Sequence, residues 1–333
     1  MRLRLIPDDT NIDFFKHARL TFGASCVAVL LALAVWFTMG LNYGIDFRGG
    51  TTLRTQSDAA VDVAAYRTAL EPLELGDVSI SEVFDPASDS TKHVAMVRIQ
   101  AQEGEEAASP EMIQNVEEAL KTVAPNIVFT SVESVGPKVS GELIQTAFLA
   151  VAASLGAILI YIWLRFEWQF SVGAVAALFH DVVLTIGVFS ALQIRFDLAV
   201  IAAILTIIGY SINDTVVIFD RLRENLRKYK KRDLREIMNL SVNETLSRTL
   251  MTSGTTLLAL IALLVLGGDV IRGFVFAITW GVVVGTYSSV YVAKNVVLFL
   301  GVKRDWSKKD NNNTGQYANI DALETANQHR TDV

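Results

Sequence analysis

Apolar residues gather in six long blocks along the chain, and the segments between these blocks are much more polar. The blocks span residues 20–39, 143–164, 170–192, 198–219, 249–266 and 270–292. A helix that crosses a bilayer needs about 20 mostly apolar residues, with some tolerance in either direction. The pattern therefore predicts a polytopic α-helical membrane protein with six transmembrane helices. The first block is longer than the apolar run of a cleaved leader, about 7–15 residues, so we expect a permanent anchor.

Basic residues next to the apolar blocks predict the orientation of the helices. They precede the first block, occupy the segment between the fourth and fifth, and follow the sixth. These residues are Arg2, Arg4, Lys16, Arg19, Arg221, Arg223, Arg227, Lys228, Lys230, Lys231, Arg232, Arg235, Lys303, Arg304, Lys308 and Lys309. With six crossings the three segments share one side, which the positive-inside rule makes cytoplasmic.

This topology divides the chain into parts with different expected roles. In order, these are a cytoplasmic N-terminus (1–19), the first transmembrane helix (20–40), an external domain (41–142), helices two to six (143–300) with a cytoplasmic basic loop (220–248), and a cytoplasmic tail (301–333). The tail is rich in Asn, Gln, Thr and Asp, and we expect it to be disordered. The basic loop is expected to set the topology rather than to bind nucleic acid or a specific lipid.

The external segment has the pattern of a small α+β domain. Its expected strands cover residues 51–56, 77–84, 92–100 and 127–133, and its expected helices residues 61–70 and 110–123. Ser57 and Asp58 are expected to cap the first helix, and Ser109 with Pro110 is a typical start for the second. The resulting order, βαββαβ, is that of a ferredoxin-like domain between helices one and two.

Composition excludes several classes of protein. Charged residues make up only 19% of the chain, below the value of about 25% that is usual in soluble proteins. With 21 Gly, 6 Pro and the single Cys26, the chain is neither collagenous nor cross-linked internally by disulfides. The external domain has no phosphate loop, metal-ligand cluster or nucleophile–base spacing, and its lone His93 is expected on a strand surface. We therefore predict no enzymatic activity, no cofactor and no metal site.

A carboxylate inside the fourth apolar block carries the main functional hypothesis. Asp214 shares one helical face with Ser211 and Thr215, and Asn213 lies beside it. An ionisable residue near the centre of a span costs at least about 2.5–3.5 kcal/mol on insertion scales, so it normally faces a partner or water. Protonation of such a carboxylate changes helix packing, which makes ion-driven conformational work the natural hypothesis. The residues alone do not distinguish a proton from a sodium ion.

Arg248 enters the fifth apolar block from the same side as Asp214. It begins a polar stripe that continues through Thr252, Thr255 and Thr256. The geometry allows a pair between Arg248 and Asp214, either direct or through water. The alternative is an anchor whose long side chain reaches along the helix to the membrane surface.

Two further patterns lie in the other apolar blocks. His180 and Asp181 are close to the middle of the third block. They form either a second proton-accessible site or a partner for Asp214, or else a hydrogen-bonded packing element between helices. Ser211, Asn213 and Thr252 are candidates for the same relay or packing role. Gly281 and Gly285, which are spaced as in Gly-x-x-x-Gly, are expected to let another helix pack closely.

Four sequence stretches, taken in order and at their spacing, resemble the SecF family of bacterial protein-export subunits. The stretches are Gly-Ile-Asp-Phe-Arg-Gly-Gly at 44–50, Val-Gly-Pro at 135–137, Gly-Tyr-Ser-Ile-Asn-Asp-Thr-Val-Val-Ile-Phe-Asp-Arg at 209–221, and Asn-Glu-Thr-Leu-Ser-Arg-Thr-Leu-Met-Thr-Ser-Gly-Thr-Thr at 243–256. The last two are the more specific. The similarity covers roughly residues 15–302.

The resemblance implies a multi-pass protein of the bacterial inner membrane whose external domain is periplasmic. It implies pairing with SecD in an assembly of the resistance-nodulation-division type, with membrane lipid around it. This assembly works with the SecYEG channel and SecA and uses proton movement to help draw unfolded exported chains outward. By position, Asp214 and Arg248 match residues that the family uses for proton conduction. The alternative is half of a proton-coupled small-molecule or ion efflux transporter, although such pumps have twelve spans and two large external domains.

The glycine-rich stretches that flank the external domain predict rigid connections. Gly49 and Gly50 indicate a turn with unusual backbone angles after Gly44, and Asp46 is expected to cap that turn or to bond to backbone amides. Gly136 and Pro137 indicate a rigid entry into the second span. A structural role is expected for these residues, against the alternative of direct contact with an exported chain.

Overall fold

The computed structural model of this chain describes residues 10–86, 91–101 and 108–302. Six long helices in this part of the chain are apolar enough to cross a membrane. They are α1 (Ala18–Met39), α5 (Pro137–Arg165), α6 (Trp168–Leu192), α7 (Leu198–Lys228), α8 (Leu234–Leu266) and α9 (Asp269–Ser288), which continues through the π-helical η2 (Ser289–Ala293) into α10 (Lys294–Leu300). The predicted six-helix architecture is confirmed.

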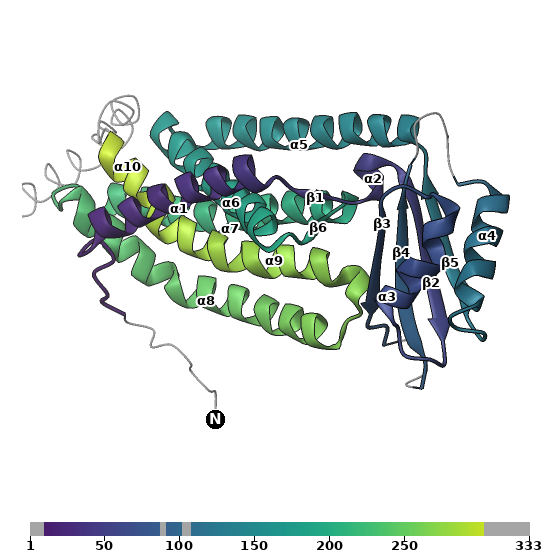
Figure 1. Cartoon of the computed structure of the whole chain (residues 1–333). Helices are drawn as coiled ribbons and strands as arrows, with labels where there is room; N and C mark the ends of the chain where they lie inside the picture. The colour runs from purple at the N-terminus through teal and green to yellow at the C-terminus, as the bar shows by residue number, and fades with distance from the viewer. Residues whose placement is uncertain (1–9, 87–90, 102–107, 303–333) are drawn as a thin grey trace, which may run out of the picture.

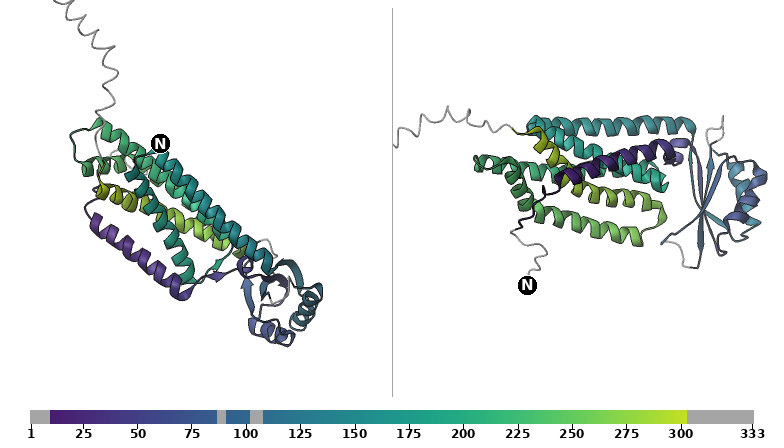
Figure 2. Two further views of the ribbon diagram at one scale, coloured as in Figure 1. Left: turned by 90° about the horizontal axis from the view of Figure 1, so that it is seen from above. Right: turned by 60° about the vertical axis from the view of Figure 1, so that its left-hand side comes forward.

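The six helices run lengthwise in one bundle, and the sheet domain caps one end of it (Figures 1 and 2). Helices α6, α7 and α9 form the centre, where Phe189, Ala203, Ile207 and Ala277 pack together. Helices α1, α5 and α8 bury few of their side chains and lie at the periphery. The predicted N-terminal segment is described only from residue 10.

The segment predicted as a basic loop, residues 220–248, is helical over most of its length. Helix α7 continues to Lys228 and α8 begins at Leu234, so only residues 229–233 connect them. Charged side chains mark where a helix leaves the bilayer, but they are good helix formers and do not end it. Asp233 caps α8 by accepting a hydrogen bond from the Arg235 amide at 3.1 Å. The predicted tail lies outside the described residues, apart from its first two.

The external domain has the predicted βαββαβ order. Its elements are β2 (Gly50–Ser57), α3 (Val63–Leu70), β3 (Val78–Val83), β4 (His93–Gln100), α4 (Pro110–Lys121) and β5 (Val128–Val135), with a 3-10 turn, η1 (Glu71–Leu73), after α3. The antiparallel sheet has the order β3-β4-β2-β5, which is the ferredoxin-like arrangement.

The helix starts in this domain follow capping chemistry. Ser109 caps α4 as predicted, because its hydroxyl accepts a hydrogen bond from the Met112 amide at 3.1 Å. The predicted cap of α3 at Ser57 and Asp58 is wrong. Asp62 caps that helix instead, and its carboxylate accepts from the amides of the second and third helical residues.

The two faces of the sheet have different neighbours. Helices α3 and α4 cover the face that points away from the bundle (Figure 2), and Leu53, Val97 and Leu120 form the core between them and the sheet. Met96 and Arg98 alternate with these core positions on β4, so their side chains point to the face that meets the bundle. His93 lies at the start of β4 as a surface residue, 3.0 Å from Glu82.

The connection between α1 and the domain is short and rigid. It consists of β1 (Asn42–Tyr43), which pairs in parallel with β6 (Arg195–Phe196), and the single turn α2 (Ile45–Arg48). Gly50 has φ +133°, and a Cβ atom there would collide with the carbonyl oxygen of Ile99. Only glycine fits this position.

Candidate functional site

Asp214 lies on the buried face of α7, and its side chain has almost no access to the surroundings. Its relative exposure is 3%, and that of the neighbouring Ser211 and Thr215 is 1% each. Within the described residues, neither Asp214 Oδ2 nor Thr215 Oγ1 has a hydrogen-bond partner. A buried carboxylate without a partner is costly, so Asp214 is stabilised by taking up a proton or by contact with a cation or another chain.

Arg248 lies on an exposed face of α8, and among the described residues no ion pair within 4.0 Å joins it to Asp214. The direct pair that the sequence allowed is therefore not formed in this structure. The reason is geometric, since Asp214 is on the inner face of α7 while Arg248 points out of the bundle. Arg248 still interacts electrostatically with the Asp214 carboxylate.

The hydroxyl stripe above Arg248 is satisfied within its own helix. Thr252 Oγ1 donates to the carbonyl oxygens of Arg248 at 3.1 Å and Thr249 at 3.0 Å. Thr255 and Thr256 likewise donate to carbonyl oxygens one turn earlier. These threonines therefore do not link Arg248 to Asp214 in this structure.

The opposite face of α7 exposes a polar residue at membrane depth. Asn213, which precedes Asp214 in the sequence, is exposed, as are Thr206 and Gly209 on the same side of the helix. A Cβ atom at Gly209 would meet nothing within 4 Å. Exposed amide groups are unfavourable against lipid hydrocarbon, so this face is suited to contact with another protein.

Asp181 forms a fully paired network at the centre of the bundle. Its Oδ2 atom accepts hydrogen bonds from Ser211 Oγ at 2.6 Å and from Ser288 Oγ at 2.8 Å. Its Oδ1 atom lies 2.9 Å from Nδ1 of His180. The exposed fractions of Asp181 and His180 are 1% and 4%. One carboxylate therefore joins α6, α7 and α9, and its bond to Ser211 is one helical turn from Asp214.

The network extends to α1 through a tyrosine that the sequence did not single out. The ring of Tyr287 stacks on His180 with centroids 6.1 Å apart, and its hydroxyl group lies 3.0 Å from Ser25 Oγ. Tyr287 also donates to the carbonyl oxygen of Thr21 at 3.1 Å. Ser288 lies seven residues after Gly281 and therefore on the same face of the helix, which is the only sequence pattern that points to this cluster. No nearby residue pattern points to Tyr287.

Two glycines on α9 make these short bonds sterically accessible, as predicted from their spacing. A Cβ atom at Gly281 would collide with Ile207 of α7, and one at Gly285 would lie 3.1 Å from Ser211 Cβ. The backbone of α9 thus approaches α7 closely enough for Ser288 and Ser211 to reach the same carboxylate oxygen.

The glycine-rich motif after α1 contacts the start of α7. Asp46 Oδ2 accepts a hydrogen bond from the Leu198 amide at 3.0 Å, and Gly44 donates its amide to the carbonyl oxygen of Phe196 at 2.8 Å. Gly49 packs against residues 135–137, which include Gly136 at the start of α5 and the following Pro137. The two predicted connections between bundle and domain therefore touch each other.

Two arginines, Arg98 and Arg195, lie close together where the sheet of the domain meets the start of α7. Burial and the nearby Arg195 guanidinium lower the pKa of Arg98 to about 10, while Asp197 opposes the shift. Arg195 is itself paired with Asp197 at 3.0 Å, and Asp197 caps α7 by accepting from the Val200 amide at 3.1 Å. The sheet of the domain and the N-terminus of α7 are thus in direct electrostatic contact.

In the part of the chain that the structure describes, no group of three or more His, Cys, Asp or Glu side chains is placed to hold a metal ion. Asp214 is buried and unpaired, whereas Asp181 is buried and saturated with donors. The first is suited to bind and release an ion, and the second to hold three helices in register.

Comparison with known proteins gives matches along most of the chain. Residues 115–303 match the family described as protein export membrane protein SecD/SecF, C-terminal, and residues 34–61 match the SecD/SecF GG motif. The protein translocase subunit SecF of Cereibacter sphaeroides is 67% identical over 321 residues, which are 96% of this chain and 99% of the relative. SecF of Rhodobacter capsulatus is 61% identical and covers 93% of this chain and 95% of its own.

Two solved structures are also similar. The crystal structure of SecDF from Thermus thermophilus, a translocon-associated membrane protein, is 37% identical with a TM-score of 0.79. A SecDF structure described as the super-membrane-facing form is 38% identical with a TM-score of 0.65. They cover 89% and 88% of this chain, but the chain spans only 39% of each SecDF chain.

Proposed function

Because the chain belongs to the SecD/SecF family of protein-export membrane proteins, we propose that it is a SecF subunit that uses the proton gradient, together with SecD, to assist export of unfolded polypeptides. It would act beside the SecYEG channel and SecA in the bacterial inner membrane, with both termini cytoplasmic and the ferredoxin-like domain in the periplasm. The two SecF relatives are named as translocase subunits, and the match covers 95–99% of their length. This favours the proposal over the alternative, half of an efflux transporter.

One observation carries the proposal, the buried and unpaired carboxylate of Asp214. Moving one charge across a membrane potential releases about 2.3 kcal/mol per 100 mV. Protonation of Asp214 removes a buried charge, and deprotonation restores it, so the two forms favour different packing around α7. A gradient that alternates these forms would drive repeated movement of that helix.

The contacts at the periplasmic end of the bundle offer a route from α7 to the domain. The Leu198 amide at the start of α7 donates to Asp46, in the motif that leads into β2. At a second point, Phe84 after β3 donates its amide to Asp269 Oδ2 at 2.5 Å, and the Asp269 amide donates back to the Phe84 carbonyl oxygen at 3.0 Å. Movement of α7 against α9 would therefore tilt the sheet.

The exposed face of α7 is where SecD would pack. Asn213 on this face and Arg248 on α8 are both exposed in the isolated chain. A second membrane subunit would cover Asn213 and shield Arg248 from lipid. Because Asp214 lies on the inner face of α7, a hydrated path to it would then open only when α7 turns or shifts against α8.

The test is export into inverted membrane vesicles that contain the SecD–SecF pair, with and without a protonophore. We expect Asp214→Asn to abolish the gradient-dependent part of export while leaving co-purification with SecD intact. Asp220→Asn is the matched control, because Asp220 lies on the same helix but is exposed and paired with Arg165 at 2.9 Å. Full gradient-dependent export by Asp214→Asn would refute the proposal.

A further inference from the structure

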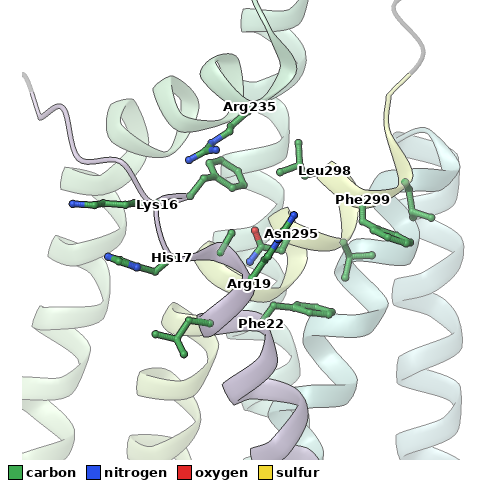
Figure 3. A pocket seen from close by; sticks show the side chains of 13 residues that line it. Lys16, His17, Arg19, Phe22, Arg235, Asn295, Leu298 and Phe299 are labelled. Atoms are coloured by element: carbon green, nitrogen blue, oxygen red, sulfur yellow. The ribbon is translucent and has the colours of Figure 1, made fainter.

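A groove of about 840 Å³ opens beside α10 (Figure 3), at the end of the bundle remote from the sheet domain (Figure 1). It lies between the start of α1, the start of α8 and helix α10. Its walls include Lys16, His17, Arg19, Phe22, Arg235 and Phe299. Neither the sequence motifs nor the proposed export mechanism accounts for this groove.

The groove combines a basic mouth with an apolar wall. Lys16 and Arg19 are exposed beside the first turn of α1, and neither makes an ion pair within the described residues. Phe22 is 38% exposed and Phe299 is 91% exposed. Because α1 begins at Ala18, Lys16 and Arg19 lie at the membrane surface. Phe22 lies about one helical turn deeper on α1, and Phe299 lies beside it on α10.

Arg235 adds a third cation from α8. It is paired with Asp13 at 3.4 Å, and both side chains are about half exposed, at 50% and 52%. An exposed pair at this distance is weak. A phosphate group in the groove would therefore compete with Asp13 for the guanidinium and would form charge-assisted hydrogen bonds with it.

A buried acceptor in the groove points to a ligand with a hydroxyl group. The Asn295 side chain lines the groove, and its Nδ2 atom donates to the Tyr291 carbonyl oxygen at 2.6 Å. This bond fixes the orientation of the amide. Its Oδ1 atom is then buried without a hydrogen-bond partner in the described structure. Buried acceptors are normally satisfied, and a rotation of the amide that opens Oδ1 to the groove would let a polyol headgroup supply the missing donor.

We propose that this groove binds one anionic phospholipid with a hydroxylated headgroup, of the phosphatidylglycerol class. Its phosphate would contact Lys16, Arg19 and Arg235, a headgroup hydroxyl would donate to Asn295, and an acyl chain would lie along Phe22 and Phe299. The lipid would tie α1 to α10 and α8 at the membrane surface. Placing it in the cytoplasmic leaflet rests on the proposed orientation, but the binding itself does not.

The test measures lipid retention by the full-length chain, purified in detergent, by native mass spectrometry. Phosphatidylglycerol and phosphatidylethanolamine are titrated separately, and competition with inorganic phosphate is measured. We expect one phosphatidylglycerol to be retained in preference, and Lys16→Gln with Arg19→Gln to weaken it about tenfold or more. The matched control, Lys231→Gln with Arg232→Gln, removes the same two charges outside the groove and should bind like the parent.

Two further variants separate the sources of binding. Phe299→Ser should weaken the retention of phosphatidylglycerol. Asn295→Leu should reduce the preference for phosphatidylglycerol over phosphatidic acid, which lacks the glycerol hydroxyls. Size-exclusion profiles and thermal melting show whether each variant is folded. Equal retention by the Lys16/Arg19 variant and the parent, equal losses in the control, or displacement of the lipid by inorganic phosphate would each overturn the proposal. Failure of Asp214→Asn to affect export would leave it untouched.

Discussion

Asp46 and Leu198 are 152 residues apart in the sequence, and the carboxylate of the first accepts a hydrogen bond from the amide of the second at 3.0 Å. Leu198 is the first residue of α7. Helix N-termini carry unpaired amides and partial positive charge, so a carboxylate there is stabilising. The motif that follows α1 therefore holds the helix that carries Asp214.

Replacing Asp46 should weaken both folding and coupling. In Asp46→Ala the Leu198 amide loses its acceptor, and we expect the free energy of unfolding to fall by about 0.5–2 kcal/mol, as for other lost helix caps. Gradient-dependent export should fall more than gradient-independent export. Thermal melting in detergent and vesicle export measure the two effects.

Asp46→Asn separates hydrogen bonding from charge, because the amide oxygen still accepts from Leu198. We expect this variant to retain most of the stability and part of the export stimulation. Asp77→Ala, an exposed site before β3 in the same domain, serves as the control. Unchanged gradient dependence in Asp46→Ala would show that the bond anchors the chain without transmitting movement.

The Asp181 network should contribute more to stability than any exposed ion pair. Ser288→Ala removes one donor from a buried carboxylate, and we expect a loss of about 1–3 kcal/mol in the free energy of unfolding. Asp181→Leu removes the charge but takes the partner from Ser211 and His180, while Ser288 can still donate to the Gly285 carbonyl oxygen at 3.1 Å. This variant should be at least as destabilising. Denaturation in detergent measures both.

The Ser288→Ala variant also decides between a packing role and a proton-relay role for His180 and Asp181. If they form a packing element, Ser288→Ala should lower stability while gradient-dependent export per folded complex stays constant. A selective loss of gradient-dependent export, with normal stability, would instead support a proton relay.

Hydrophobic pattern and capping chemistry were sufficient for most of the fold. Six spans follow from apolar length, and Ser109 with Pro110 marks the start of α4 because both residues act within a few positions of the chain. Helix ends beyond the membrane were missed. Residues 220–228 and 234–248 include several charged side chains, which indicates departure from lipid but is compatible with continued helix.

The site was only partly accessible from sequence. Asp214 was identifiable because a carboxylate in an apolar block is conspicuous wherever its side chain points. Its separation from Arg248 depends on the rotation of α7 and α8 about their axes, which spacing along the chain does not determine. The bonds from Ser211 and Ser288 to one oxygen of Asp181 depend on how closely three helices approach, and Tyr287 carries no local signal at all.

Lys294 provides a test of how buried charge is tolerated in this bundle. It is 1% exposed, and its Nζ atom has no hydrogen-bond partner within the described residues. The ammonium group lies 4.0 Å from the centroid of the Phe15 ring and 5.0 Å from that of Phe14. Cation–π attraction gives about 2 kcal/mol when desolvated, less than the several kcal/mol that burial of a charge costs.

We therefore expect Lys294→Met, which keeps the volume but removes the charge, to be at least as stable as the parent. Lys294→Ala should lose about 2–5 kcal/mol because it leaves a cavity. Thermal melting of the parent, Lys294→Met and Lys294→Ala measures both effects on stability. A large loss in Lys294→Met would mean that the cation–π contacts with the N-terminal segment outweigh desolvation.

Arg248 distinguishes a functional cation from a membrane anchor. Arg248→Lys keeps a positive charge on a flexible stem but loses the planar, five-donor guanidinium. An anchor needs only the charge, so the anchor hypothesis predicts full gradient-dependent export. If Arg248 instead meets Asp214 when SecD covers α7, the altered geometry should reduce gradient-dependent export severalfold without changing stability.

Arg223→Lys is the matched control, because Arg223 lies at the same end of the bundle but contacts the Arg165 carbonyl oxygen rather than the path to Asp214. Equal activity of both variants would identify Arg248 as an anchor.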